Sequence, residues 1–272
     1  MLSAPLIGAL ALLTAAVGAV GGLGGAVLLV PLLVVFGLPV TEAAPLGLLS
    51  VAAGSLAAGS RQLMEQTVNH RLGVVTEIAA SAGAVGGALV SGIASDAVLK
   101  GVLAMTAAVA AVAGGRRKGI RNPPQAGYGE ADVGEWRGRL AGAYRVGAGV
   151  APYKARRIPA GLAAMTVSGV VAGLSGASGG FIKTPATSEL MHVPVKVAAS
   201  TTTFSIGVTS AAGLLIFALQ GRIDGSTAAP VLAGAILGGS VGAALQSKLS
   251  PPVVRRALSV VLLTVAVVLV IR

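Results

Sequence analysis

Long apolar runs separated by short polar junctions are the main feature of the chain. Most of them are about 20 residues long, which is the length that an α-helix needs to cross a hydrocarbon core of about 30 Å. The pattern therefore predicts an all-α integral membrane protein, a helix bundle of roughly seven to nine hydrophobic segments. The runs cover residues 5–36, 41–60, 72–92, 97–113, 158–191, 196–219, 226–247 and 253–271.

Two of these runs, 5–36 and 158–191, are too long for a single crossing. A straight helix of 32 residues would measure about 48 Å, which overshoots the membrane. Each run is interrupted by a glycine cluster, and glycine adopts the backbone angles that end a helix. We therefore expect each run to form a helical hairpin, in which a shorter helix returns after a glycine turn enclosed by protein.

The parts of the chain on either side of the polar stretch at 113–158 repeat one another. Matching residues recur at nearly constant spacing, which is typical of an internal duplication. We expect a first membrane repeat at 1–113, a basic cytoplasmic loop at 114–156 and a second membrane repeat at 157–272. The matches at a spacing of 154 are Gly25 with Gly179 and Pro31 with Pro185, and those at 155 are Ala43 with Ala198 and Ser50 with Ser205.

Composition supports the membrane assignment. Hydrophobic residues make up 54% of the chain and charged residues 11%, whereas soluble domains carry about 25% charged residues. The 40 glycines recur at small-xxx-small spacing, which lets membrane helices approach closely. Examples are Gly83 with Gly87, and Gly234 with Gly238 and Gly242.

The net charge of +11 could indicate nucleic-acid binding in a soluble protein. In a membrane protein, cytoplasmic loops carry an excess of Lys and Arg, so we assign the charge to topology and expect lipids rather than nucleic acid as partners. We place 114–156 in the cytoplasm. If both long runs are hairpins, each half then crosses three times, the halves are inverted and both chain ends lie outside. A competing topology of eight crossings makes the halves parallel. We expect a multi-pass protein of the bacterial inner membrane.

The glycine-broken helices are the candidate substrate site. A helix that begins inside a membrane presents unpaired N–H groups and a partial positive charge, which bind anions. Transporters with inverted repeats place their substrate at such helices near the midplane. The alternative is that the glycines serve only close packing. The candidate residues are Gly24, Gly25, Ser175, Ser178, Gly179, Gly180, Lys183, Thr201 and Thr202.

Lys183 lies inside an apolar run, where a charge is costly and usually functional. It could bind the anion, it could extend its ammonium toward the membrane surface, or it could pair with Glu77 or Glu189. Glu77 could also carry a proton. The serine and threonine hydroxyls could contact substrate or bond back to their own helices.

The sequence indicates neither a metal site nor an enzyme. The chain has two histidines and no cysteine, and it lacks the glycine-rich lysine motif that binds nucleotide phosphates. We therefore expect no cofactor and no catalytic residues.

The glycine motifs resemble those of the TauE/SafE family of bacterial sulfite and sulfonate exporters. The first is Gly-Gly-Leu-Gly-Gly-Ala-Val-Leu-Leu-Val-Pro-Leu-Leu at 21–33, and the second is Gly-Leu-Ser-Gly-Ala-Ser-Gly-Gly-Phe-Ile-Lys-Thr-Pro at 173–185. Gly-Arg-Ile-Asp at 221–224 and Leu-Ser-Pro at 249–251 are also similar to the family. The resemblance covers nearly the whole chain except 114–156. Lys183 departs from the family pattern, where an apolar or small residue is expected.

This resemblance implies export of a small organosulfur anion, such as sulfite or a sulfonate, by a secondary transporter. The alternatives are an anion channel built on the same hairpins, a carrier of a small carboxylate, and a membrane scaffold that docks partners through the basic loop. The chain could also form a homodimer.

Overall fold

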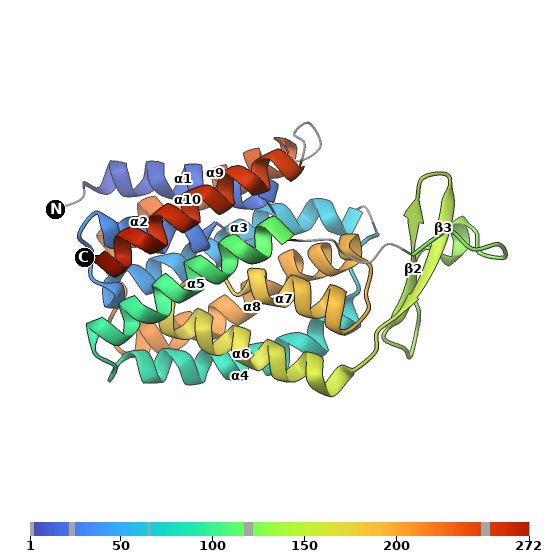
Figure 1. Ribbon diagram of the computed structural model, residues 1–272, viewed down its shortest axis with the longest axis horizontal. Helices are drawn as coiled ribbons and strands as arrows, with labels where there is room; N and C mark the ends of the chain where they lie inside the picture. The colour runs from blue at the N-terminus through green and yellow to red at the C-terminus, as the bar shows by residue number, and fades with distance from the viewer. Residues whose placement is uncertain (1–2, 22–24, 65, 117–121, 246–250, 272) are drawn as a thin grey trace.

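The computed structural model of the 272-residue chain describes residues 3–21, 25–64, 66–116, 122–245 and 251–271. Helices dominate this part of the chain, as the hydrophobic pattern predicts (Figure 1). They are α1 (Ala4–Gly21), α2 (Ala26–Val35), α3 (Val40–Met64), α4 (His70–Ser91), α5 (Asp96–Arg116), α6 (Ile158–Ser175), α7 (Gly180–Pro185), α8 (Val195–Leu219), α9 (Gly225–Leu245) and α10 (Pro251–Ile271).

The membrane assignment is confirmed. Six helices, namely α3, α4, α5, α6, α8 and α9, are long and apolar enough to cross a bilayer, and the described parts of α1, α2 and α10 are shorter apolar helices. Large apolar side chains also remain exposed on the outside of the bundle, where lipid would cover them. The chain is therefore a multi-pass helical membrane protein.

Both long runs are broken where the glycine clusters predict a break. The first run divides into α1 and α2, which pack against each other. The second divides into α6 and α7, and α7 continues as one π-helical turn at Ala186–Leu190. Gly176 ends α6 with φ of +68°, a left-handed conformation that glycine adopts without a steric penalty. Each long run is thus divided into two helices at its glycine cluster, as predicted, while residues 22–24 of the first cluster lie outside the described residues.

The helices of the two halves correspond in position. α1 and α6 begin and end 154 residues apart, and α3 and α8 begin and end 155 residues apart. Their packing corresponds as well, because α1 packs on α9 as α6 packs on α4, and α3 packs on α9 as α8 packs on α4. α3 and α8 also pack against each other.

Glycines allow the closest of these helix contacts. A Cβ on Gly83 of α4 would lie 2.2 Å from the carbonyl oxygen of Thr166 in α6. A Cβ on Gly238 of α9 would lie 2.2 Å from the carbonyl oxygen of Leu12 in α1. The expected close packing is therefore confirmed, and it extends to Gly87, Gly234 and Gly242.

The prediction of an all-α protein is wrong for the polar segment between the halves. Three antiparallel strands form a small sheet in the order β1 (Gly134–Glu135), β2 (Ala141–Val146) and β3 (Gly149–Lys154). β2 and β3 are joined by a two-residue loop in which Gly147 has φ of +57°, as such a hairpin requires. The sheet lies beyond one end of the bundle, while α1 begins and α10 ends at the opposite end (Figure 1).

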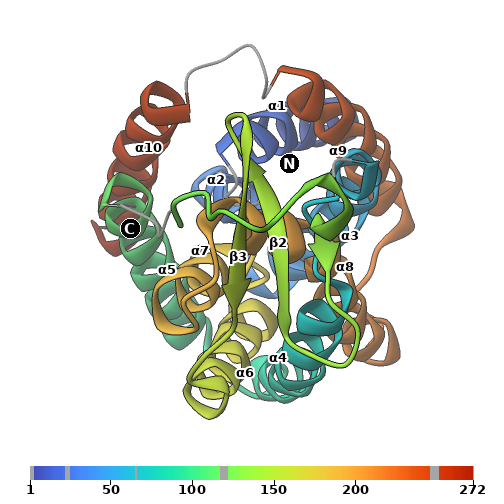
Figure 2. The ribbon, with the colours of Figure 1, turned by 90° about the vertical axis from the view of Figure 1, so that its right-hand side faces the viewer.

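The sheet is docked on the bundle by specific contacts. Viewed from its side, it lies across the end of the helices (Figure 2). Tyr144 and Tyr153 of the sheet belong to one buried apolar cluster with Met191 and Val193, which follow the second hairpin. The side-chain amide of Asn69, the N-cap of α4, donates to Tyr153 Oη over 3.0 Å and to the Ala141 carbonyl over 3.3 Å.

Candidate functional site

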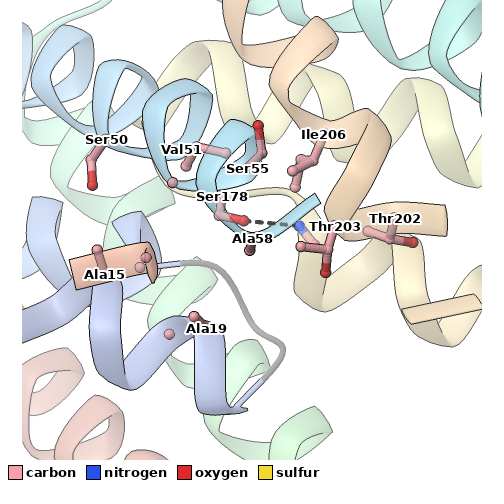
Figure 3. Close-up of a pocket in the computed structure, with 15 residues that line it drawn as sticks. Ala15, Ala19, Ser50, Val51, Ser55, Ala58, Ser178, Thr202, Thr203 and Ile206 are labelled. Atoms are coloured by element: carbon pink, nitrogen blue, oxygen red, sulfur yellow. Dashed lines mark hydrogen bonds between the residues drawn. The ribbon is translucent and has the colours of Figure 1, made fainter. Parts of the chain in front are cut away.

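A cavity of about 50 Å³ lies where the two glycine turns approach α3 and α8. Figure 3 shows side chains of α1, α3 and α8 around it, together with Ser178 from the second turn. The volume is far below the 300–1,000 Å³ of sites that hold drug-sized ligands, so the cavity suits a ligand of a few heavy atoms. Its polar lining includes Gly25, Ser50, Ser55, Ser178, Gly180 and Thr202.

Four residues predicted from the sequence line this cavity, namely Gly25, Ser178, Gly180 and Thr202. Gly25 precedes α2 so closely against α1 that a Cβ would lie 2.7 Å from Ala15 Cα. The Ser178 hydroxyl accepts a hydrogen bond from the Gly180 N–H over 3.2 Å, at the start of α7. The cavity therefore brings together residues that begin both return helices.

Other predicted residues have structural contacts outside the lining. The Ser175 hydroxyl bonds back to the Val171 carbonyl of its own helix over 2.7 Å. The Thr201 hydroxyl accepts from the Asn69 N–H over 3.0 Å. The Gly179 carbonyl accepts from the Ser168 hydroxyl over 2.8 Å. Gly24 lies outside the described residues.

Lys183 forms a buried ion pair rather than part of the described cavity lining. Its ammonium nitrogen lies 2.6 Å from Glu77 Oε1 and 2.6 Å from Thr209 Oγ1. The residues Lys183 and Glu77 are only 1% and 4% exposed. Of the two partners that the sequence left open, the structure shows Glu77, whereas Glu189 is exposed.

Two hydroxyl groups complete the environment of Glu77. Ser205 donates to Glu77 Oε1 over 2.8 Å, and Thr209 donates to Glu77 Oε2. The network thus joins α4, α7 and α8. It also adjoins the cavity, because Thr202 of the lining, Ser205 and Thr209 follow one face of α8 at helical spacing.

Ser50 is a candidate that the sequence reasoning missed. It is 2% exposed, it lines the cavity from α3, and its hydroxyl has no hydrogen-bond partner in the part of the chain that the structure describes. Buried polar groups in proteins are normally hydrogen-bonded, so an orphaned one calls for an explanation. Ser205, its counterpart 155 residues later, donates to the Glu77 carboxylate. That repeat spacing was the available signal, although it served only as a marker of duplication.

The described part of the lining carries no ionisable side chain. Its polar groups are hydroxyls and the backbone around the two turns, which can donate hydrogen bonds without adding a full charge. Among the described residues, His, Cys, Asp and Glu side chains do not gather in groups of three or more that could hold a metal ion. The arrangement can therefore surround a small ligand that carries acceptor oxygens.

Comparison with known proteins identifies the family. The model of the family described as Sulfite exporter TauE/SafE matches residues 7–269. The chain belongs to the TauE/SafE family. It is also 31% identical over 105 residues to "Probable membrane transporter protein YunE" of Bacillus subtilis (strain 168), a match that covers 39% of this chain and only 38% of that relative. No solved structure matches the chain.

The TauE/SafE-like Gly-Arg-Ile-Asp motif at 221–224 lies away from the cavity and holds helix ends together. Arg222 donates to the Thr41 carbonyl over 2.7 Å and to the Ser91 hydroxyl over 2.8 Å, and its guanidinium lies 4.4 Å from the centroid of the Phe217 ring. Partial burial lowers the pKa of Arg222. Hydrogen bonds from Ser226 lower the pKa of Asp224.

Proposed function

We propose that this TauE/SafE protein is a secondary transporter that exports a small organosulfur anion, such as sulfite or a sulfonate, from a cavity between its two glycine turns. The observation that carries the proposal is the unpaired, buried hydroxyl of Ser50 in a cavity to which both turns contribute. An oxyanion in the cavity would supply the acceptor that this hydroxyl lacks. Family membership supports transport, and the small volume supports a ligand of a few heavy atoms.

The two turns would supply further donors. Gly25 directly precedes the ten-residue helix α2, whose first N–H groups have no partner within the helix. Those groups and the helix dipole give this end a partial positive charge that favours an anion. Gly180 begins the return helix of the second hairpin. Together with the hydroxyls of the lining, these groups would hold an anion without a charged residue in the described lining.

The two halves would act as inverted repeats. Corresponding helix bounds, reciprocal packing and the start of α1 and end of α10 opposite the sheet support this arrangement. In such transporters, rocking of one repeat against the other exposes a central site to each side in turn. The positive-inside rule would place the sheet and 114–156 in the cytoplasm of a bacterial cell, with the chain in its inner membrane.

Transport in proteoliposomes tests the proposal. Purified protein is reconstituted and the entry of ³⁵S-labelled sulfite is followed with and without unlabelled sulfite inside. A carrier shows saturable uptake that internal sulfite accelerates, and methanesulfonate competes. Preferential competition by acetate would instead favour the carboxylate carrier. A planar-bilayer current far above carrier turnover would favour a channel, and absence of binding and exchange would reject transport of these anions.

A further inference from the structure

The buried ion pair with Lys183 holds the Glu77 carboxylate well away from the ends of α4. Glu77 is the eighth residue of α4, so it lies about 10 Å along the helix from the first residue. The remaining described acidic residues lie near helix ends or outside the helices. A carboxylate in this position is costly in a membrane protein and is typical of ion or proton pathways.

The charge on Lys183 is not required to build a return helix. At the repeat spacing of 154, its counterpart in the first hairpin is Leu29, which is completely buried in α2. An apolar residue therefore fills the corresponding place in the other half. Replacing a buried ion pair by apolar side chains is often neutral or stabilising, so packing alone does not account for the charges.

Charge balance links this pair to the cavity. Bringing an uncompensated anion out of water is costly, and the described lining has no cation to offset it. Lys183 follows the lining residue Gly180 by one turn, but Glu77 already neutralises its charge. If Glu77 takes up a proton, the positive charge of Lys183 becomes available to balance an anion.

We propose that Glu77 and Lys183 form a proton-coupling site, in which Glu77 takes up one proton for each monovalent anion that enters the adjacent cavity. This proposal rests on the proposed transport function. The proton comes from water on the side to which the cavity is open, forms an O–H bond on the Glu77 carboxylate, and returns to water when the anion leaves. No covalent bond to the anion forms or breaks. Net movement of anion and proton together is electrically neutral.

The described elements that pack against Glu77 and Lys183 carry few other charged groups that could take up the coupled proton. α6 carries no charged residue, and the remaining titratable groups of α4, α5, α8 and the π-helical turn lie near the ends of those elements. Those groups are His70, Arg71, Asp96, Lys100, Arg116, Glu189 and Lys196.

Binding of methanesulfonate at several pH values tests the coupling, because this probe stays a monovalent anion throughout the range. While Glu77 is ionised in the free protein, uptake of one proton per anion should raise the Kd about tenfold per pH unit between about pH 6 and pH 8. Glu77→Gln lacks the carboxylate that takes up the proton and should lose this dependence wherever Lys183 keeps its charge, whereas the double variant described below removes both groups. In proteoliposomes, uptake by the wild type should respond to a pH gradient but not to the membrane potential. Uptake by Glu77→Gln should respond to the membrane potential but not to a pH gradient.

Two further variants keep the test decisive. Glu77→Gln/Lys183→Met leaves no stranded charge and should bind methanesulfonate weakly at a pH-independent Kd. Asp96→Asn removes the carboxylate of an exposed pair with Lys100 and should retain the wild-type pH dependence. A folded double variant whose Kd still rises tenfold per pH unit would overturn the proposal. Wild-type exchange without proton coupling would also overturn it and leave transport standing, whereas a lack of binding and exchange in the wild type would reject the transport function itself.

Discussion

Lys183 and Glu77 are 106 residues apart in sequence, yet the Lys183 ammonium lies 2.6 Å from the Glu77 carboxylate. Both side chains are almost completely withdrawn from solvent. The pair is the charged link between the second glycine hairpin and α4, and it lies beside the cavity rather than within its described lining.

Removing the lysine alone should therefore destabilise the protein. Lys183→Ala leaves the Glu77 carboxylate buried without its cation, and breaking a buried pair in this way typically costs about 3–5 kcal/mol. We expect a lower midpoint of thermal unfolding in detergent. Adding Glu77→Gln should recover most of the loss because the stranded charge is gone. A Lys183→Ala variant as stable as the wild type would contradict this account of the pair.

Ser50 should contribute directly to anion binding. Its hydroxyl is buried in the cavity wall without a partner, and a hydrogen bond to a charged group contributes about 1.5–3 kcal/mol. Ser50→Ala should therefore weaken the binding of sulfite or methanesulfonate by about 10- to 150-fold while the protein remains folded. Isothermal titration calorimetry on the purified protein measures the change.

Ser210→Ala is the matched control for Ser50→Ala. Ser210, on α8, is also buried, but its hydroxyl already donates to the Ile206 carbonyl over 3.1 Å and it is absent from the described cavity lining. Its replacement should leave affinity close to that of the wild type. Equal losses in the two variants would show that the Ser50 effect is a general consequence of altered packing.

The sequence predicted the helical architecture well because its signals are local. Run length and glycine clusters indicated both hairpins, and the repeat spacing matched helices that the structure places in corresponding packing positions. Lys183 was recognised as unusual from its apolar surroundings. The choice between Glu77 and Glu189 could not be made, because it depends on how distant helices pack.

The sheet was missed because its charged residues concealed a weaker pattern. Arg137, Arg139 and Arg145 made the segment look like a polar loop. β2 and β3 nevertheless contain valine and tyrosine around a short glycine-containing turn, which is a hairpin signal. The repeat spacing singled out Ser50, but it could not show that the hydroxyl is unpaired, since a serine in a membrane helix usually bonds to its own backbone.

Alkaline pH should loosen the docked sheet. Burial raises the pKa of Tyr153 to about 12 from an ordinary value of 10.0, so the folded protein favours the neutral phenol. The corresponding stability, on the order of 2–3 kcal/mol, is present below pH 10 and is lost as the pH rises through about 12.

Two optical signals follow that change. Phenolate absorbance near 295 nm should reveal the late ionisation, and fluorescence of Trp136, the single tryptophan, should report the structure of the sheet region. Tyr153→Phe should remove the ionisation step with a midpoint near pH 12, and it also removes the acceptor for the Asn69 amide. Retention of that step in the variant would assign it to another tyrosine.

The orientation in the membrane can be tested cleanly because the chain contains no cysteine. Gln125 lies in the segment that carries the sheet, whereas Ser95, between α4 and α5, is exposed and belongs to a junction that the positive-inside topology places outside. In intact cells, a membrane-impermeant maleimide should label Ser95→Cys directly and Gln125→Cys only after permeabilisation.

Ser3→Cys, just before α1, should behave like Ser95→Cys if the first hairpin begins and ends on the outer side. Labelling of Gln125→Cys in intact cells would invert the whole orientation. Protection of Ser3→Cys together with labelling of Ser95→Cys would instead mean that the first hairpin crosses the membrane, and the two halves could then not be inverted repeats.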